Sequence, residues 1–379
     1  MKVAILGGYP INKNEIGGVQ TYLYNLAGVL SKNDNIDPHV LVMGSHNKTW
    51  ISNGLTIHII KRIKIPLSNT FWNVYPLIKK INEIKPEIIH CHNAFPPYSL
   101  ATLILKKEYP TLFTVLGIIE KEKNYLWQKK RDFPKKLFYP LLEKFVYTNL
   151  NNIVVLTPYV EYEVKKIILR GPHIFYTVAA GVSLDFYQAS IKKEKDRLLY
   201  VGVIEPRKGI LDLLKTIKKL KIMKPDINLH IVGKIKSYTY YQQLLEYIEE
   251  NNLSNHIWFH SNLSKKEILN EYEKASIFIL PSYEESFGIV LLEAMATGTP
   301  IIATSVGGIP YVVQEKVTGY LVNPGDIENI IKYTIKLLND ENERKRMGKN
   351  GIKHASKFKW ENIGKQIIHC YEEVIEAYT

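Results

Sequence analysis

Residues 277–294, IFILPSYEESFGIVLLEA, place a strand, a loop and a helix in direct succession. The run Ile277–Leu280 is apolar without alternation, which is typical of a parallel strand covered on both faces. The loop ends at Gly288, and the helix-forming stretch that follows is apolar except for Glu293, which we expect about two turns inside the helix. A carboxylate in that setting needs polar partners or a polar cleft, although an exposed helix face would also accommodate it.

The same strand-then-helix unit recurs along the chain, with helices expected at Val19–Leu30 and Ile210–Leu220. Short apolar strands are expected at 3–6, 40–43, 57–60, 88–90, 112–115, 153–156, 198–203, 229–232, 257–260, 277–280 and 300–303. This alternation predicts an α/β protein built from doubly wound, mostly parallel sheets.

The length of 379 residues suggests about two domains. A charged stretch without apolar periodicity lies at Asp185–Arg197, and we place the boundary there. The expected domains are 1–184 and 185–361, two Rossmann-like halves that face each other across a cleft, where ligands usually bind.

Charge and cysteine content narrow the function classes. The net charge of +13 suits an anionic partner such as a nucleotide, a nucleic acid or an anionic membrane, although a solvated lysine-rich surface explains it equally well. Cys91 and Cys370 are the only cysteines and lack metal-ligand spacing, so we expect no metal and no disulfide. The first residues resemble a buried strand rather than a signal peptide, and no apolar run approaches 18 residues, so a cytoplasmic location is expected.

Three further loops are candidates for binding an anion. Gly17-Gly18 precedes an apolar helix, where glycines allow close backbone approach and free N–H groups face a ligand, although a plain tight turn is an alternative. Arg207-Lys208 stands just before a helix N-terminus, where two cations oppose the macrodipole and suggest a compensating diphosphate; a solvated pair is the alternative. Ser305–Pro310 follows the strand at 300–303. Convergent loops at strand ends are what a nucleotide diphosphate requires, whereas the missing G-x-G-x-x-G pattern disfavours an oxidoreductase.

On these residues the chain resembles the GT4 family of retaining glycosyltransferases (glycosyl transferases group 1, GT-B fold) over nearly its whole length. The most specific feature is the pair Glu285 and Glu293 with Pro281-Ser282 and Phe287-Gly288 beside it. The other matching segments are Gly17-Gly18, His90-Cys91-His92-Asn93, Gly181-Val182, Gly202–Gly209, Thr318–Gly325 and Trp360.

The resemblance implies a GT-B architecture, transfer of a hexose-type sugar from a nucleotide diphosphate with retention, and neither metal nor cofactor. It implies that the second domain holds most of the donor and that the last helix, 362–379, crosses back onto the first. Glu285 and Lys208 would be the catalytic residues, with Glu285 near the donor sugar and Lys208 on the diphosphate. The implied donor-binding set is Gly17, Gly18, Arg207, Lys208, Glu285, Phe287, Gly288, Ile289 and Glu293, with Glu293 on the ribose.

The acceptor side is less well defined. Candidate residues on the first domain are His90, His92, Asn93, Leu116 and Gly117, and the acceptor is expected to be a glycan or a lipid-linked molecule. Three positions depart from the family pattern: Leu116 replaces a histidine, Val203 an arginine and Tyr311 a glutamate. Leucine offers no hydrogen bond to a sugar and valine no charge to phosphate, so these changes bear on turnover and donor choice.

Several functions therefore stay open. The main prediction is an active glycosyltransferase, and the alternatives are a nucleotide-sugar-binding protein that has lost catalysis or an epimerase of the same fold, which the glutamate pair disfavours. A nucleic-acid-binding role would explain the charge, but no recognition motif is present.

A basic, aromatic-rich segment suggests one further partner. Between Lys121 and Lys136 seven cations stand against Glu122 and Asp132, with aromatic residues interleaved. Such a segment can lie in a membrane interface, so we expect peripheral contact with an anionic membrane at the inner face of the cell. A solvated basic face whose aromatic rings pack on the domain is the alternative.

Overall fold

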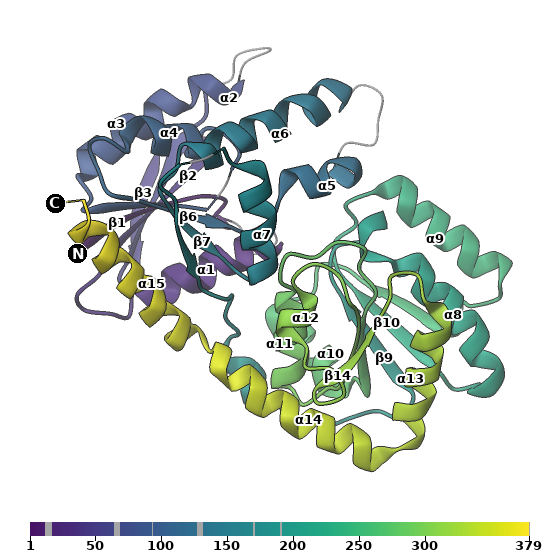
Figure 1. Cartoon of the computed structure of the whole chain (residues 1–379). Coiled ribbons are helices and arrows are strands. Elements are labelled where there is room, and N and C mark those ends of the chain that lie inside the picture. The colour runs from purple at the N-terminus through teal and green to yellow at the C-terminus, as the bar shows by residue number, and fades with distance from the viewer. Residues whose placement is uncertain are drawn as a thin grey trace. The chain divides into compact units, whose positions relative to one another are not determined.

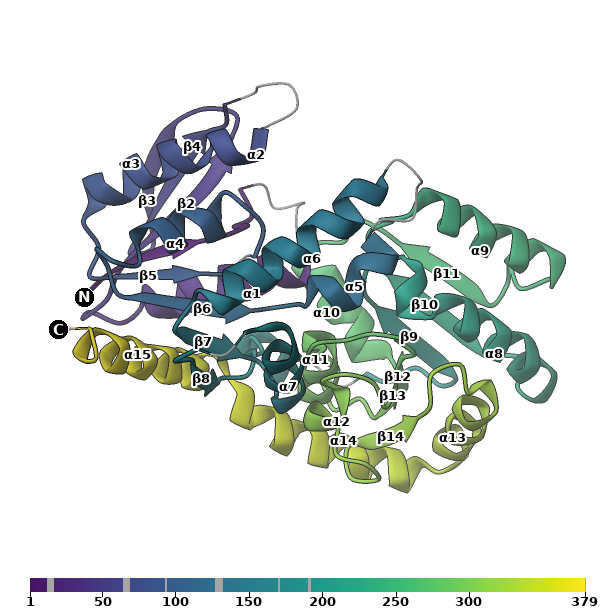
Figure 2. The same cartoon turned by 45° about the horizontal axis from the view of Figure 1, so that its top comes forward.

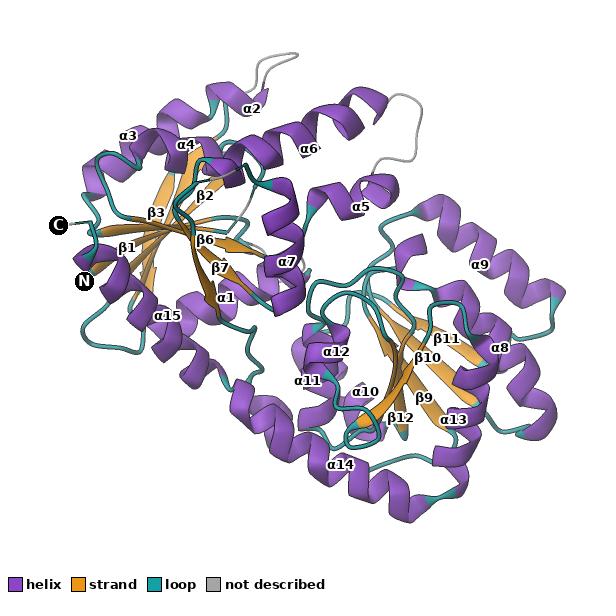
Figure 3. Cartoon of the chain, in the orientation of Figure 1, coloured by secondary structure: helices purple, strands orange, loops and turns teal. Residues whose placement is uncertain are grey.

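The computed structural model describes residues 1–11, 17–63, 69–92, 94–126, 132–169, 171–189 and 192–378. It consists of two compact units, Met1–Ala180 with Trp360–Thr379, and Gly181–Lys359 (Figure 1). Within each unit, helices cover both faces of a twisted sheet (Figure 3). No helix in these described ranges is both long and apolar enough to cross a bilayer.

The first unit contains an eight-stranded sheet in the order β3-β4-β2-β1-β5-β6-β7-β8. All neighbouring strands are parallel except β3 and β4. The strands are β1 Lys2–Leu6, β2 Asp37–Gly44, β3 Lys48–Ser52, β4 Leu55–Lys61, β5 Ile88–Cys91, β6 Thr111–Val115, β7 Asn152–Val155 and β8 Ile174–Thr177. The helices are α1 Gly18–Leu30, α2 Asn69–Trp72, α3 Val74–Ile84, α4 Tyr98–Leu105, α5 Ile119–Leu126, α6 Phe133–Thr148, α7 Pro158–Ile167 and the last helix of the chain, α15 Trp360–Glu376.

The second unit contains a six-stranded parallel sheet in the order β11-β10-β9-β12-β13-β14. The strands are β9 Arg197–Val201, β10 Asn228–Val232, β11 Ile257–His260, β12 Ile277–Leu280, β13 Ile301–Thr304 and β14 Gly319–Val322. The helices are α8 Ile210–Met223, α9 Tyr238–Glu250, α10 Lys265–Lys274, α11 Ile289–Ala296, α12 Ile309–Val312, α13 Ile327–Asn339 and α14 Glu341–Ala355. Short 3₁₀ turns occupy Leu184–Tyr187, Pro206–Lys208 and Ser356–Phe358.

Both sheets reverse their strand order at one point. In the first unit the chain builds outward from β1 to one side and then returns to build outward from β5 on the other; β9 and β12 play the same parts in the second unit. The loops that leave such a pair of neighbouring strands diverge to opposite faces, which opens a crevice at their carboxyl ends where open α/β sheets bind ligands.

The last helix completes the first unit. Trp360 packs edge-on against Tyr22 of α1 with 5.2 Å between ring centroids, and a side chain at Gly364 would approach Val29 to 2.8 Å. The chain passes between the units after Ala180 and again after Lys359, whereas the sequence analysis placed the crossings at 184 and 361. The reason is local: Val182 pairs with Lys359 in a parallel bridge, so both crossing strands join the second unit.

The sequence analysis omitted three strands and misplaced one helix start. β3 and β8 are edge strands with largely exposed side chains, and β14 begins at a glycine, so none of the three has the uniform apolar run of a central strand. Helix α11 begins at Ile289, which places Glu293 just over one turn inside it rather than two. The basic segment Lys121–Lys136 is divided between α5 and α6, and its residues 127–131 lie outside the described ranges.

Gly209 is the position where an added side chain is expected to be least tolerated. It has φ +67°, and a Cβ there would lie 2.1 Å from the carbonyl oxygen of Pro281. We expect Gly209→Ala to lower the free energy of unfolding by about 3 kcal/mol or more, because it combines left-handed strain with a backbone collision. Gly28→Ala is the matched control, since its Cβ would meet nothing within 4 Å inside α1. Chemical denaturation measures both, and equal stabilities would contradict the expectation.

Candidate active site

The switch point of the second sheet brings a cation and a carboxylate together. Lys208 stands in the loop after β9 and Glu285 in the loop after β12, and their side chains form an ion pair. Only 9% of the lysine and 15% of the glutamate side chain is exposed. The two residues predicted to be catalytic are therefore direct neighbours at the edge of the sheet where α/β proteins bind ligands.

Arg207 extends this pair into a network with an excess of positive charge. Its Nε lies 2.6 Å from a carboxylate oxygen of Glu205, and the other oxygen of Glu205 lies 2.7 Å from Lys236 Nζ. One guanidinium nitrogen of Arg207 also donates to the carbonyl of Glu284 at 3.2 Å. Three cations thus face two carboxylates, Glu205 and Glu285, in a largely buried loop cluster. That imbalance favours an added anion.

Glu285 is held in its ionised form. Burial alone would raise its pKa, but the charges of Lys208 and Arg207, with the backbone N–H of Ser286, lower the pKa below its usual range. A carboxylate with a lowered pKa stays negative at neutral pH. It can therefore offset positive charge that develops on a sugar.

Helix α11 begins beside this cluster without a side-chain cap. Its N-cap is Gly288, which has φ +86° and no side chain to accept a hydrogen bond from the first turn. Gly308 packs against the same loop so closely that a Cβ would lie 2.0 Å from the Ser286 carbonyl oxygen, and its N–H donates to the Glu285 carbonyl at 2.8 Å. An uncapped helix N-terminus favours a bound anion, so Phe287, Gly288 and Ile289 are placed to serve one.

Glu293 lies one turn farther along α11 and has a different environment. One of its carboxylate oxygens accepts a hydrogen bond from Tyr272 Oη of α10 at 2.8 Å. Burial raises its pKa to about 7, and the contributions of Tyr272 and Lys265 only partly offset this increase. The two glutamates of the motif are thus chemically distinct, since Glu285 is a charge-paired carboxylate and Glu293 is a carboxyl group that exchanges its proton near neutrality.

The glycine turn of the first unit has the same kind of helix start. Gly17 is the N-cap of α1 with no side-chain hydrogen bond, and a Cβ at Gly18 would meet nothing within 4 Å. Both glycines thus leave the N-terminus of a 13-residue helix open. Glu15, the preceding residue of this motif, lies outside the described ranges.

The two histidines that follow β1's neighbour, β5, are buried. His90 is fully buried, and its two ring nitrogens lie 2.7 Å from Tyr371 Oη and 2.7 Å from Thr114 Oγ1. His92 is 2% exposed, and its ring stands 3.9 Å from that of His90, centroid to centroid. Burial holds the pKa of His92 at about 3 and that of His90 well below its usual range, so both are neutral.

We therefore reassign His90 from the acceptor side to the interior of the first unit, where it ties β5 and β6 to α15. His92 is placed at the carboxyl end of β5, but it reaches little solvent. Asn93 lies outside the described ranges. Leu116 and Gly117 directly follow β6 and are half-buried, so Leu116 is not a deep core residue.

The other departures from the family pattern are also accessible. Val203 is half-buried, and its carbonyl accepts from Tyr200 Oη at 3.0 Å, so the backbone of this loop is secured without a charged side chain. Tyr311 is 53% exposed in α12. Neither residue contacts the Lys208–Glu285 pair in any interaction of the described residues recorded above.

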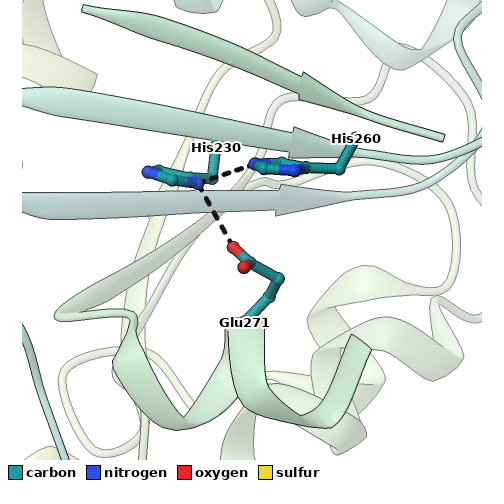
Figure 4. A group of neighbouring side chains, drawn as sticks. All are labelled: His230, His260 and Glu271. Atoms are coloured by element: carbon teal, nitrogen blue, oxygen red, sulfur yellow. Dashed lines mark hydrogen bonds and ion pairs between the residues drawn. The ribbon is translucent and has the colours of Figure 1, made fainter. Parts of the chain in front are cut away.

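One group of metal-ligating side chains lies elsewhere in the second unit. His230 of β10, His260 of β11 and Glu271 of α10 point toward one another (Figure 4), and His230 Nδ1 lies 2.8 Å from His260 Nε2 and 3.3 Å from Glu271. However, Arg197 donates to Glu271 at 2.6 Å and lies 3.0 Å from His230 Nδ1. The guanidinium supplies the positive charge and helps hold the pKa of Glu271 at about 2 against the effect of burial. We interpret the group as a packed charge network.

Sequence reasoning missed several partners of the site. Tyr272, Glu205 and Lys236 hold Glu293 and Arg207, but they lie in other loops and helices. No spacing pattern links such residues to a motif. Tyr283 likewise donates to Asp212 at 2.6 Å, which anchors the glutamate loop to α8.

Comparison with known proteins agrees with this arrangement. Residues 16–185 match the family described as Glycosyltransferase Family 4, and residues 184–354 match Glycosyl transferases group 1. The chain belongs to this family of glycosyltransferases. An uncharacterised glycosyltransferase of Methanocaldococcus jannaschii is 29% identical over 367 residues, which cover 95% of each chain.

Solved structures show that this glycosyltransferase has the GT-B fold. A sucrose-phosphate synthase from Thermosynechococcus elongatus superposes with a TM-score of 0.84 at 20% identity and covers 99% of both chains. An Anabaena protein, HepE, solved in complex with UDP-glucose, gives a TM-score of 0.77 at 15% identity and covers 98% of this chain and 100% of that one. The predicted family and the two-domain GT-B fold are thereby confirmed.

Proposed function

We propose that this protein transfers a hexose-type sugar, with retention of anomeric configuration, from a nucleotide diphosphate to a glycan or a lipid-linked acceptor. The observation that carries the proposal is the cluster at the switch point of the second sheet. There the Lys208–Glu285 pair, Arg207 and the uncapped start of α11 meet. Membership of the glycosyltransferase family supports the reaction class.

The chemistry asks for stabilisation of a leaving anion. The acceptor oxygen forms a bond to the anomeric carbon, the bond from that carbon to the diphosphate breaks, and its electron pair leaves with the nucleoside diphosphate. Lys208, Arg207 and the N–H groups of Phe287–Ile289 would stabilise the charge that develops on the diphosphate. Glu285 would lie against the sugar, whose anomeric carbon becomes electron-poor.

The ribose would bind at Glu293. A carboxylate accepts hydrogen bonds from two neighbouring hydroxyls, and charge-assisted bonds of this kind contribute roughly 1.5–3 kcal/mol each. The position of Glu293 on α11, with Tyr272 fixing one oxygen, supports this role. Val203 stands where relatives carry an arginine, so Arg207 would provide the second cation from a different place in the loop.

The choice of donor is tested with a panel of nucleotide sugars. UDP-glucose is the first candidate because HepE was solved with it. A donor present at 100 times its dissociation constant should stabilise the fold by about 2.7 kcal/mol, which thermal-shift measurement detects. Reactions with the selected donor are then analysed by mass spectrometry for a sugar-bearing product, with and without a chelator. No stabilisation by any nucleotide sugar would overturn the proposal.

A binding protein without turnover is the second candidate. Leu116 and Val203 favour it, since neither side chain offers the hydrogen bond or the charge found in relatives. The two functions differ in one result: a binding protein is stabilised by the donor but forms no product with any acceptor. We place the active enzyme in the cytoplasm, working without a metal or a cofactor.

Donor affinity is expected to fall as the pH drops below about 7. The pKa of Glu293 is raised to about 7, so at lower pH its carboxyl group must release a proton before it can accept two ribose hydrogen bonds. Linkage then predicts that the dissociation constant rises by up to about tenfold for each pH unit below 7. Glu285, whose pKa is lowered, stays ionised in this range and adds nothing to the slope.

Calorimetric titration between pH 6 and pH 8 measures this dependence. Buffers of different ionisation enthalpy report the released proton directly. Glu293→Gln serves as the control, because its affinity should be low and independent of pH. A wild-type affinity that stays constant across the range would show that Glu293 does not bind the donor as a carboxylate.

A further inference from the structure

Helix α6 of the first unit has apolar side chains on its outer face. Phe133, Leu137, Leu141 and Phe145 follow one another at intervals of four residues and are 68%, 61%, 60% and 55% exposed. Residues four apart lie on the same side of a helix. This ridge runs along the outside of the first unit (Figures 1 and 2).

The ridge is the face opposite to the one that packs. Leu142, Val146 and Tyr147 of the same helix are buried in the core of the first unit. A water-facing helix places polar residues opposite such a buried stripe. Because α6 is apolar on both sides, its outer side is not explained by the folding of the unit.

Neighbouring elements enlarge this surface. Phe138, 45% exposed, continues the ridge sideways and meets Phe71 of α2 at 6.4 Å between ring centroids. Trp72 beside it is also exposed. On the other side an apolar hollow of about 240 Å³ lies between α4 and α6, lined by Leu100, Leu103, Ile104, Lys106, Phe145 and Asn149. We call the five side chains Phe133, Leu137, Phe138, Leu141 and Phe145 the outer face of α6.

The charges on α6 have one sign. Lys135 and Lys144 are exposed and Lys136 is half-buried, whereas the only acid within Phe133–Thr148, Glu143, is fully buried. Glu143 accepts the backbone N–H groups of Ile119 and Glu120 at 2.7 and 2.9 Å, so it caps α5. In the described part of this helix, no carboxylate therefore offsets the lysines at the surface.

We propose that the outer face of α6 docks this protein on an anionic phospholipid surface. The apolar side chains would enter the boundary between headgroups and acyl chains, while Lys135, Lys136 and Lys144 extend to the lipid phosphates. Contiguous apolar patches on a soluble surface mark interaction sites. Lysines beside such a patch favour lipid over a second protein, because the cores of protein interfaces are depleted in lysine.

This differs from the membrane segment predicted from the sequence. Of the cations in Lys121–Lys136, Lys121 forms an ion pair with Glu163 at 2.9 Å and Lys123 pairs with Glu120. Lys129, Lys130 and Arg131 lie outside the described ranges. The proposal therefore rests on α6 and does not depend on sugar transfer.

Co-sedimentation with vesicles tests the proposal. The probes are vesicles of phosphatidylcholine alone and of phosphatidylcholine with phosphatidylglycerol in equal parts, at low and high salt. We expect wild-type protein to bind the anionic vesicles, to bind less at high salt, and to bind phosphatidylcholine alone weakly. Leu137→Gln with Leu141→Gln, and separately Lys135→Glu with Lys144→Glu, should each weaken binding by about tenfold or more.

Matched controls carry the same changes on other surfaces. Ile51→Gln with Ile222→Gln removes two exposed apolar side chains from β3 and α8, and Lys218→Glu with Lys365→Glu reverses two exposed lysines on α8 and α15. These variants should bind vesicles like wild type. Thermal unfolding confirms that each variant is folded, which is expected because all eight positions are exposed.

Three outcomes would overturn the proposal. The first is no binding of wild type to anionic vesicles at low salt, and the second is equal binding by the Leu137/Leu141 variant and wild type. The third is a wild-type dimer that this variant splits into monomers without any vesicle binding. That result would assign the outer face of α6 to a second copy of the chain.

Discussion

Lys208→Ala is expected to lower kcat/KM for the preferred donor about a thousandfold, because one preorganised donor to a developing anion contributes at this level. Lys208 is almost fully buried and pairs with Glu285, so no neighbouring solvent-exposed lysine can take its place in the same geometry. Steady-state release of the nucleoside diphosphate measures the loss. The matched control is Lys218→Ala, which removes an exposed lysine of α8 and should leave the rate unchanged.

Unfolding could mimic this loss, since Lys208→Ala leaves Glu285 buried without its partner. The double variant Lys208→Met with Glu285→Gln removes both charges and keeps similar side-chain volumes, so its stability should recover toward wild type. Its activity should not recover. An activity within about threefold of wild type in the folded single variant would remove Lys208 from the reaction.

Glu293→Ala is expected to weaken donor binding by about a hundredfold or more, because two charge-assisted hydrogen bonds to ribose are lost together. Glu285→Ala should affect the dissociation constant less and kcat more, since its proposed partner is the sugar whose charge changes during the reaction. Calorimetric titration with the preferred donor separates the two variants.

Tyr272→Phe is the control for indirect effects on Glu293. It keeps the carboxyl group but removes the hydrogen bond from Tyr272 Oη, so donor affinity should change only a fewfold at pH 8. Wild-type donor affinity in Glu293→Ala would refute the ribose assignment, and an equal loss in Tyr272→Phe would indicate a structural role for the pair.

The elements that carry the proposed chemistry could be predicted from sequence because they are local. The strand, loop and helix of Ile277–Ala294 follow from uniform hydrophobicity, a proline, a glycine and an apolar run. Both switch points also follow from strand order once the βα alternation is recognised. The edge strand β3 could not be predicted in this way, because its exposed side chains leave no apolar pattern.

Environments that depend on tertiary contacts were beyond the sequence. His90 in a strand has the same appearance whether it binds a ligand or joins Thr114 and Tyr371, and Tyr371 is 281 residues away. The contrast between Glu285 and Glu293 arises from Lys208 on one side and Tyr272 on the other. For α6, the sequence shows aromatic residues among lysines, but only packing reveals which of them face outward.

The most direct test of the central claim is the anomeric configuration of the product. Proton NMR is recorded on the first product that forms from the nucleotide sugar selected by thermal shift, before any equilibration. Our account predicts an α-linked sugar from an α-linked donor, and no such product with Lys208→Ala. A β-linked product would contradict retention, and the absence of any sugar-bearing product across a panel of glycan and lipid-linked acceptors would contradict the assignment as an active transferase.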